Sequence, residues 1–370
     1  MGTSLIKVLL LIPTLDRSGA EKQFTLLAKG LHDRGFDVRA VALTRGGPYE
    51  QSLREAGVPV EVLFKRWKLD PAALWKLRRI VRSWKPDILH SWLFAANASA
   101  RLVAGRKKKR PKVLVSERCV DTWKSGWQLA LDRRQVGRTT RLIANSQSVA
   151  EFYRQHGFPQ ERIVVIPNGV DCTEDEAADR KQILAELGVP AGSRIVGSVG
   201  RLARQKRVGD LVWAMQLLRQ ITDRVYFLVI GDGPERDRAE RLARHMGCDH
   251  LMRFLGHRSD ASRFFRCMDV FWLGSNFEGM SNSIMEAMAA GVPVVATNIA
   301  ANRELVTDGE TGYLVEVGDC VGFAQFTDRL LADPETARRF GEAGRERMQR
   351  EFSVEQMIQR HAALYREVVG

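Results

Sequence analysis

A chain of 370 residues is about twice the length of a typical single domain, and 45% apolar with 27% charged residues is the composition of a folded protein. No apolar run reaches the roughly 20 residues needed to cross a bilayer, and five scattered cysteines without CxxC spacing argue against zinc sites and structural disulfides. We therefore expect two domains, no signal peptide and a cytoplasmic location.

The net charge of +13 is concentrated in the first half of the chain. Residues 1–172 hold 31 Lys and Arg against 15 Asp and Glu, a net of +16, and the remainder has a net charge of −3. This asymmetry indicates an anionic partner such as lipid headgroups, nucleic acid or a phosphorylated acceptor. A role in solubility alone would produce the same excess.

Short apolar strands alternate with helices through the first half. Phe24, Leu27, Ala28 and Leu31 recur at helical spacing, which predicts a helix from Ala20 to Arg34 that Gly35 ends. The expected strands are Lys7–Ile12, Val38–Leu43, Val60–Phe64, Asp87–His90, Val113–Ser116 and Leu142–Asn145.

The same alternation restarts after residue 172, beyond a polar stretch at Glu174–Arg180 that is typical of a linker. Strands separated by helices predict parallel sheets covered on both faces, with ligands at the carboxyl ends of the strands. The pattern indicates an α/β protein of two Rossmann-like domains facing across a cleft, residues 1–172 and 173–352. We expect residues 353–370 to form a helix that returns to the first domain. The second-half strands are predicted at Arg194–Val199, Val225–Ile230, Asp269–Leu273 and Val292–Thr297.

The stretch from Ser275 to Val295 carries the strongest chemical signal. It reads as a loop, a helix, a tight turn and a buried strand, so the amides of Met280 to Ser283 lie where a helix N-terminus attracts anions. Glu278 and Glu286 flank this turn, and carboxylates accept hydrogen bonds from sugar hydroxyls. Ser283 and Glu286 also have the spacing of a capping box, which is the structural alternative.

These residues resemble the signature of glycosyltransferase family four, the group 1 glycosyltransferases. Glu278, seven intervening residues and Glu286 are followed by Ala-Met-Ala-Ala-Gly-Val-Pro-Val-Val, as in that family. The resemblance implies a GT-B fold, a nucleotide-diphosphate sugar donor with UDP favoured, retention at the anomeric carbon, and neither metal nor other cofactor. Further matching stretches are Ile166–Asp171, Gly200–Leu202 with Lys206, Gly231–Pro234, Phe254–Gly256 and Asp308–Gly312.

The resemblance implies a role for each residue of the donor site. Arg201 and Lys206 would stabilise the leaving diphosphate in place of a metal ion. Glu278 with the amides after it would hold the sugar, and Glu286 the ribose. Other predicted donor contacts are Gly231 and Gly233 in a turn under the nucleotide, Arg258 beside the base, and Gly279, Met280, Ser281 and Asn282.

Two further candidates belong to the first domain. Gly19 opens the first long helix where the family has a Gly-Gly pair facing the donor phosphates; Ser18 replaces the first glycine here, and Ser can still cap a helix. His90 is the candidate for the catalytic histidine near the fourth strand end, with a buried, hydrogen-bonded histidine as the alternative. Glu117 and Arg118 also follow a strand end, where they would contact acceptor or sugar.

Basic and aromatic residues are mixed in the segment Phe64–Lys85, in the run Arg106–Arg110 and at Trp123, Lys124 and Trp127. Helical spacing turns Leu74, Leu77, Ile80, Val81 and Trp84 toward a core. Trp67, Lys68, Trp75, Lys76, Arg78, Arg79 and Arg82 remain for a surface suited to an anionic membrane, where a solvated face is the plain alternative.

We therefore expect a retaining, metal-independent glycosyltransferase that acts on an acceptor which is lipid-linked or a polysaccharide or glycoconjugate precursor. It would be cytoplasmic and peripheral on the inner face of the membrane, and no nucleic-acid partner is expected because no such motif is present. The alternative is a GT-B-scaffold protein without transferase activity that binds anionic membrane or nucleic acid.

Overall fold

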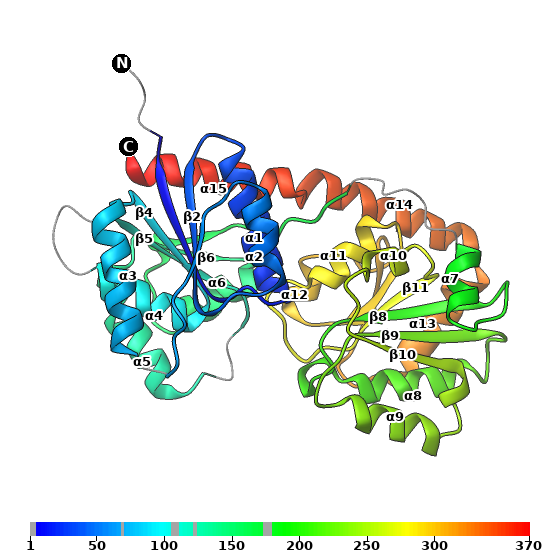
Figure 1. Cartoon of the computed structure of the whole chain (residues 1–370). Helices are drawn as coiled ribbons and strands as arrows, with labels where there is room; N and C mark the ends of the chain where they lie inside the picture. Colours follow the sequence, from blue (N-terminus) through cyan, green and yellow to red (C-terminus); the bar gives the residue numbers. More distant parts are fainter. Residues whose placement is uncertain (1–4, 68–69, 105–110, 121–123, 173–179) are drawn as a thin grey trace. The chain divides into compact units, whose positions relative to one another are not determined.

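The structure is a computed structural model that describes residues 5–67, 70–104, 111–120, 124–172 and 180–370 (Figure 1). It divides into two compact units. Unit 1 comprises Met1–Gly169 and Val354–Gly370, and unit 2 comprises Val170–Ser353. Two parts of the basic surface predicted above, Lys68 and the run Arg106–Arg110, lie outside the described residues, as do Trp123 and residues 174–179 of the expected linker.

Unit 1 is built on a seven-stranded parallel sheet with the order β3-β2-β1-β4-β5-β6-β7. Its strands are β1 (Lys7–Thr14), β2 (Asp37–Arg45), β3 (Val60–Val62), β4 (Ile88–Trp92), β5 (Lys112–Glu117), β6 (Arg141–Ala144) and β7 (Ile163–Val165). Its helices are α1 (Gly19–His32), α2 (Pro48–Glu55), α3 (Pro71–Trp84), α4 (Leu93–Ala104), α5 (Gly126–Arg134), α6 (Gln147–Gln155) and α15 (Val354–Val369).

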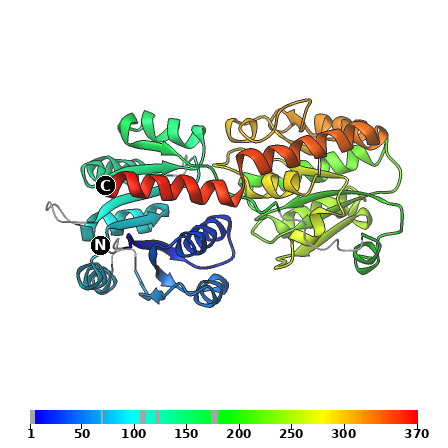
Figure 2. The ribbon, with the colours of Figure 1, turned by 90° about the horizontal axis from the view of Figure 1, so that it is seen from above.

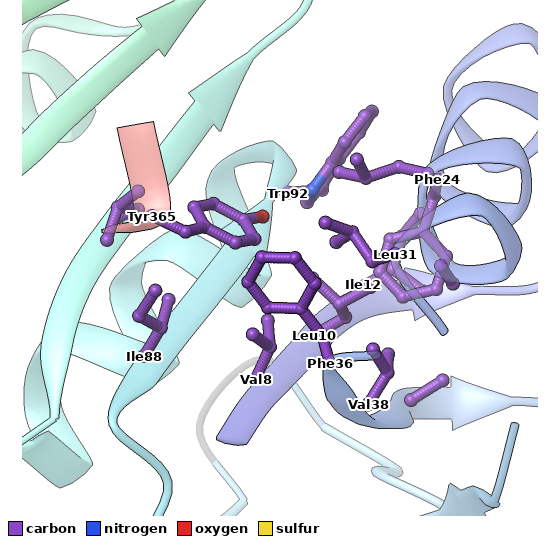
Figure 3. Packing of buried hydrophobic residues seen from close by; sticks show 14 of the residues in the cluster. Val8, Leu10, Ile12, Phe24, Leu31, Phe36, Val38, Ile88, Trp92 and Tyr365 are labelled. Atoms are coloured by element: carbon purple, nitrogen blue, oxygen red, sulfur yellow. The ribbon is translucent and has the colours of Figure 1, made fainter. Parts of the chain in front are cut away.

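The first strand shows why helices cover both faces of this sheet. Its run of apolar residues is buried on two sides, as expected for a central parallel strand. Val8, Leu10 and Ile12 pack into a core shared with α1 and α15, part of which Figure 3 shows. Leu9 and Leu11 face the opposite core, which contains residues of α3 and α4.

The last helix completes the first of these cores. Figure 2 shows α15, in red, lying among the elements of unit 1. Met357, Ile358, Ala362 and Tyr365 of this helix are buried in the cluster that contains β1. The approach to α1 is close, because a Cβ atom built on Gly30 would lie 2.1 Å from Cδ1 of Ile358.

Unit 2 repeats the plan with a six-stranded parallel sheet of order β10-β9-β8-β11-β12-β13. Its strands are β8 (Arg194–Val199), β9 (Val225–Ile230), β10 (Met252–Gly256), β11 (Val270–Leu273), β12 (Val294–Thr297) and β13 (Gly312–Val315). Its helices are α7 (Arg180–Glu186), α8 (Val208–Leu218), α9 (Arg236–His245), α10 (Ser262–Phe265), α11 (Asn282–Ala289), α12 (Ala300–Arg303), α13 (Cys320–Ala332) and α14 (Pro334–Glu351).

The predicted strands are all present, with bounds that differ by no more than two residues. Three strands were not predicted, namely β7, β10 and β13. All three lie at an edge of their sheet. Short edge strands carry little of the apolar pattern on which the prediction relies.

Candidate functional site

Two glycine-containing turns meet at the carboxyl ends of the neighbouring strands β8 and β9. Gly231 has φ +136°, and a Cβ atom there would lie 2.0 Å from the backbone oxygen of Gly200. Gly233 has φ +157°, and its Cβ would lie 2.4 Å from the backbone oxygen of Leu202. Both positions therefore require glycine, because a side chain would clash with backbone atoms and not with a side chain that can move aside. The predicted turn has this structural cause, whatever it contacts in addition.

The predicted cation and carboxylate of unit 2 lie together. Lys206 ends the short 3-10 turn Arg204–Lys206 after β8, and its Nζ is 2.5 Å from Oε1 of Glu278, which follows β11. These two strands are neighbours in the sheet. Ser275 Oγ donates to the same carboxylate oxygen at 2.6 Å. Glu278 is 8% exposed, so this ion pair is held on a nearly buried carboxylate.

Backbone and side-chain bonds fix the two loops that carry this pair. Gln205 Nε2 donates to the backbone oxygen of Phe277 at 2.6 Å, and the backbone nitrogen of Asn276 donates to the oxygen of Gln205 at 2.9 Å. Sequence reasoning did not identify Ser275 or Gln205. Each lies within three residues of a predicted site residue, and this closeness in sequence is the signal that could have identified them.

The N-terminus of α11 lies directly after Glu278. Ser281 is its N-cap residue, and its hydroxyl accepts from the backbone nitrogen of Ile284 at 3.3 Å. Ser283 lies inside the helix, so the capping-box alternative for Ser283 and Glu286 is wrong. Glu286 is half-buried one turn further on. Gly279 and Met280 are buried between the carboxylate and the cap, and Asn282 is the first residue of the helix.

Arg201 and Arg258 differ in how their side chains are held. Arg201 is exposed directly after Gly200, at the carboxyl end of β8. Arg258 donates to Asp260 through Nε at 2.8 Å and through Nη2 at 2.7 Å, and it also pairs with Glu186 at 3.3 Å. The structure thus brings Lys206 and Glu278 into contact, whereas the guanidinium of Arg258 is engaged by two carboxylates.

Gly19 is exposed at the first position of α1. Ser18 is the N-cap residue, but its side chain makes no capping hydrogen bond. Its hydroxyl donates instead to Glu21, whose other carboxylate oxygen accepts from Thr14 Oγ1 at 2.9 Å. The expected serine cap is therefore replaced by a contact with the carboxylate in the first turn.

His90 lies in the core of unit 1. Its side chain is fully buried, with Nδ1 2.5 Å from the hydroxyl of Tyr365 and Nε2 2.8 Å from Oγ of Ser116. Burial, with smaller contributions from His361 and Arg118, holds the pKa of His90 well below its usual value. Both ring nitrogens are engaged, which favours the structural alternative over a catalytic histidine. The partner Tyr365 comes from the far end of the chain, so no local pattern predicts this bond.

Glu117 and Arg118 are both nearly buried after β5. Glu117 accepts from Asn97 Nδ2 at 2.9 Å and lies 3.5 Å from Nζ of Lys124. Arg118 Nη2 donates to Oδ1 of Asn168. Their side chains are therefore held inside unit 1, next to the carboxyl ends of its central strands.

The basic and aromatic surface predicted on unit 1 is present over α3 and the loop before it. Trp67 is 73% exposed, Trp75 is 61% exposed and Trp127 on α5 is 62% exposed. The bases Lys76, Arg78, Arg79 and Arg82 are exposed as well. Of the residues expected in the core, Leu77, Val81 and Trp84 are buried, and Leu74 and Ile80 are half-buried.

Neither a membrane-spanning helix nor a cluster of metal-ligating side chains is present in the described ranges. None of the helices there combines the length and the apolar character needed to cross a membrane. No group of three or more His, Cys, Asp and Glu side chains in the same ranges is arranged to hold a metal ion.

Comparisons with known proteins agree along nearly the whole chain. The profile described as Glycosyltransferase Family 4 matches residues 17–174, and the one described as Glycosyl transferases group 1 matches residues 179–347. The lipopolysaccharide core biosynthesis glycosyltransferase LpsE of Rhizobium meliloti is 30% identical over 343 residues, 91% of this chain and 92% of that protein. The N-acetyl-alpha-D-glucosaminyl L-malate synthase of Bacillus anthracis is 26% identical over 93% of each chain.

The fold is similar to that of solved structures. The crystal structure of Anabaena HepE in complex with UDP has a TM-score of 0.87 at 23% identity, covering 98% of this chain and 100% of that chain. The same protein in complex with UDP-glucose has a TM-score of 0.86 at 23% identity, with the same coverage. Together with the two parallel sheets, this likeness confirms the predicted fold class, GT-B with two Rossmann-like domains.

Proposed function

Because this chain belongs to glycosyltransferase family 4, the group 1 glycosyltransferases, we propose that it transfers a sugar from a nucleotide-diphosphate donor to an acceptor, with UDP as the favoured nucleotide. The contact between Lys206 and Glu278 carries this proposal, because it places a cation and a nearly buried carboxylate at one sheet edge. Solved structures of similar fold with UDP and with UDP-glucose support the choice of donor.

In this proposal the residues of unit 2 divide the donor between them. Lys206 and the exposed Arg201 stabilise the negative charge that develops on the leaving diphosphate. Glu278 accepts hydrogen bonds from the transferred sugar, with Gly279 to Asn282 beside it, and Glu286 accepts from the ribose. The turn that contains Gly231 and Gly233 lies under the nucleotide. Arg258 belongs to this set only if donor binding draws it away from Asp260 and Glu186.

We propose that transfer retains the anomeric configuration by attack on the same face, assisted by the leaving phosphate. The test is transfer from a panel of UDP-sugars, with the anomeric configuration of the product read by NMR. Hydrolysis of a donor without acceptor identifies the enzyme even when its acceptor is unknown. A chain that binds UDP-sugars tightly and neither transfers nor hydrolyses them would contradict the proposal and favour a binding protein on the same scaffold.

The proposed independence from metal follows from the two cations. If Arg201 and Lys206 take the part of a metal ion, turnover persists when EDTA is present. Replacing Lys206 by Ala then costs about 2–4 kcal/mol of transition-state stabilisation, the usual loss for one charge-stabilising donor. Complete inhibition by EDTA that Mg²⁺ restores would overturn this part of the proposal.

The acceptor is proposed to be lipid-linked or a glycoconjugate precursor, reached while unit 1 docks on an anionic membrane from the cytoplasmic side. The supporting observations are the charge of residues 1–172 and the exposed tryptophans Trp67 and Trp75 beside exposed bases of α3. Tryptophan and basic side chains suit the headgroup region of anionic bilayers. A nucleic-acid partner is not proposed.

A further inference from the structure

Arg118 is a buried cation that has no ionic partner in the described part of the chain. The residue follows β5 directly and is 9% exposed. Its Nη2 donates to Oδ1 of Asn168, whereas Nη1 is buried and has no hydrogen-bond partner. Buried charges in folded proteins are normally paired, because removing a charge from water is expensive. Unit 1 therefore keeps an unsatisfied donor on a charged group.

The neighbours of this guanidinium do not neutralise it. Its central carbon lies 4.3 Å from the ring centroid of Trp92, which offers only the weak attraction of an aromatic face. The adjacent carboxylate of Glu117 is engaged by Asn97 and lies close to Nζ of Lys124. Burial consequently lowers the pKa of Arg118 to about 9.

The position of Arg118 is the edge where α/β sheets bind ligands. Strands β4, β5 and β6 are neighbours in a parallel sheet, so their carboxyl ends share one edge. Trp92 ends β4, Arg118 follows β5 and Asn145 follows β6. Oδ1 of Asn145 and Nε1 of Trp92 are also buried without hydrogen-bond partners. Three neighbouring strands thus each contribute an unsatisfied polar atom there.

We propose that Arg118 binds an oxyanion of the acceptor substrate, a phosphate or a carboxylate, through Nη1. A guanidinium suits both groups, because its N–H donors match the spacing of two anionic oxygens. The inference rests on the proposed function in assigning the anion to the acceptor, since Lys206 and Arg201 of unit 2 are given to the donor diphosphate. A buried water would satisfy the hydrogen bond of Nη1 but would leave the charge uncompensated.

The experiment is calorimetric titration of the full-length protein with inorganic phosphate and, separately, with acetate. Arg118→Gln removes the charge, and Arg118→Lys keeps the charge but lacks the paired N–H donors of a guanidinium. Arg134→Gln is the control, because Arg134 is an exposed residue of α5 in the same unit. We expect the wild type to bind at least one of the two anions. Arg118→Gln weakens that binding roughly 10- to 100-fold, Arg118→Lys weakens it less, and Arg134→Gln leaves it unchanged.

A wild type that binds neither anion, or Arg118→Gln binding both as tightly as the wild type does, overturns the proposal. Circular dichroism checks each fold, and if Arg118→Gln is unfolded the comparison of Arg118→Lys with wild type decides. Repeating the titrations with saturating UDP separates the two sources of the anion. If the affinity for the anion is unchanged, the site belongs to the acceptor, as proposed. If UDP displaces the anion and Arg118→Gln also weakens the binding of UDP, the site belongs to the donor and the proposal is overturned. Failure of UDP to bind any variant contradicts the proposed function and leaves the anion result standing.

Discussion

Glu278 and Glu286 lie eight residues apart in sequence but in different surroundings. Glu278 is tied to Lys206 and Ser275, whereas Glu286 is a half-buried residue of α11. In the proposed donor site, the first carboxylate would exchange its contact with Lys206 or Ser275 for one with the sugar. The second can contact a nucleotide without disturbing that ion pair.

We expect Glu286→Gln to weaken the binding of UDP, because ribose is common to donor and product. Glu278→Gln is expected to leave the affinity for UDP nearly unchanged and to lower turnover of the sugar donor. Calorimetry with UDP and an assay with the UDP-sugar measure the two effects separately. Equal losses of UDP affinity in both variants would contradict the assignment of one carboxylate to sugar and the other to ribose.

His361 is a second residue whose surroundings define its behaviour. It is fully buried, its Nδ1 donates to the backbone oxygen of Met357 at 2.9 Å, and its ring stacks on that of His90 with centroids 5.9 Å apart. Burial lowers the pKa of His361 to about 3, with a smaller lowering by Arg118. Tyr365, whose ring also lies against His361, is neutral because burial raises its pKa well above the usual value.

This depressed pKa makes stability depend on pH with a definite sign. The unfolded imidazole takes a proton below about pH 6.5, and the folded one does not do so until about pH 3. The contribution of neutral His361 to the unfolding free energy is complete above about pH 6.5. It is lost as the pH falls toward 3, at up to roughly 1.4 kcal/mol per pH unit. His90 adds a loss of the same sign.

We expect His361→Leu to flatten the pH dependence of the unfolding free energy between pH 6.5 and pH 4. The matched control is His156→Leu, because His156 is exposed and makes the same kind of bond, to the backbone oxygen of Phe152 at 2.7 Å. Urea denaturation at a series of pH values measures the slopes. A slope as steep in His361→Leu as in wild type would show that this histidine does not control the acid sensitivity.

At the scale of elements, the packing of α14 on the turn after α11 is set by one glycine. A Cβ atom on Gly341 would lie 2.0 Å from the backbone oxygen of Gly291, whereas one on Gly344 would lie 3.5 Å from the side chain of Met288. Both glycines are buried in the same helix. They therefore separate the effect of close packing from that of helix propensity.

We expect Gly341→Ala to lower the unfolding free energy of unit 2 by about 1–3 kcal/mol, because a backbone atom cannot move aside as a side chain can. Gly344→Ala is expected to be neutral or to add up to about 1 kcal/mol, since Ala is the better helix former and its methyl group meets ordinary contact distance. Thermal and urea unfolding, together with hydrogen exchange of the amides of unit 2, would measure the change in unfolding free energy for each variant. Equal effects of the two substitutions would exclude the close approach as the cause.

At the scale of the whole molecule, the charge asymmetry belongs to unit 1. Residues 354–370, which the structure adds to this unit, hold two bases and two acids and so leave the excess unchanged. The exposed Trp75 lies beside Arg79, whose guanidinium is 5.8 Å from the ring centroid. Each base close to an anionic surface contributes about 1 kcal/mol of attraction, and this attraction is screened by salt.

We expect the protein to sediment with anionic vesicles at low salt and to be released at about 1 M salt, where the screening length falls to about 3 Å. Replacing Trp67 and Trp75 by Ala, or Arg78, Arg79 and Arg82 by Ser, weakens this binding. Trp213→Ala is the control, because Trp213 is 50% exposed but lies on α8 of unit 2. If the wild type ignores anionic vesicles at low salt, a soluble acidic acceptor becomes the better explanation of the basic surface.

The sequence by itself determined the alternation of strands and helices, since a parallel strand covered on both faces must be apolar throughout, as Val8–Ile12 is. It also determined which residues follow each strand, and parallel strands bring those positions to one edge. The signature that resembles glycosyltransferase family four predicted the family, and that resemblance predicted Lys206 and Glu278 at a common donor site. Exposure of Trp75 followed from helical spacing, because it lies on the face of α3 opposite the buried Leu77 and Val81.

The tertiary structure decided how each side chain is engaged, because contacts between distant segments leave no local pattern in the sequence. Tyr365 comes from α15 to bond His90, 275 residues earlier, and turns a candidate catalytic residue into a buried one. Ser281, and not Ser283, caps α11, and Arg258 is held by Asp260 and Glu186. The unsatisfied charge of Arg118 is likewise visible only once its neighbours are in place.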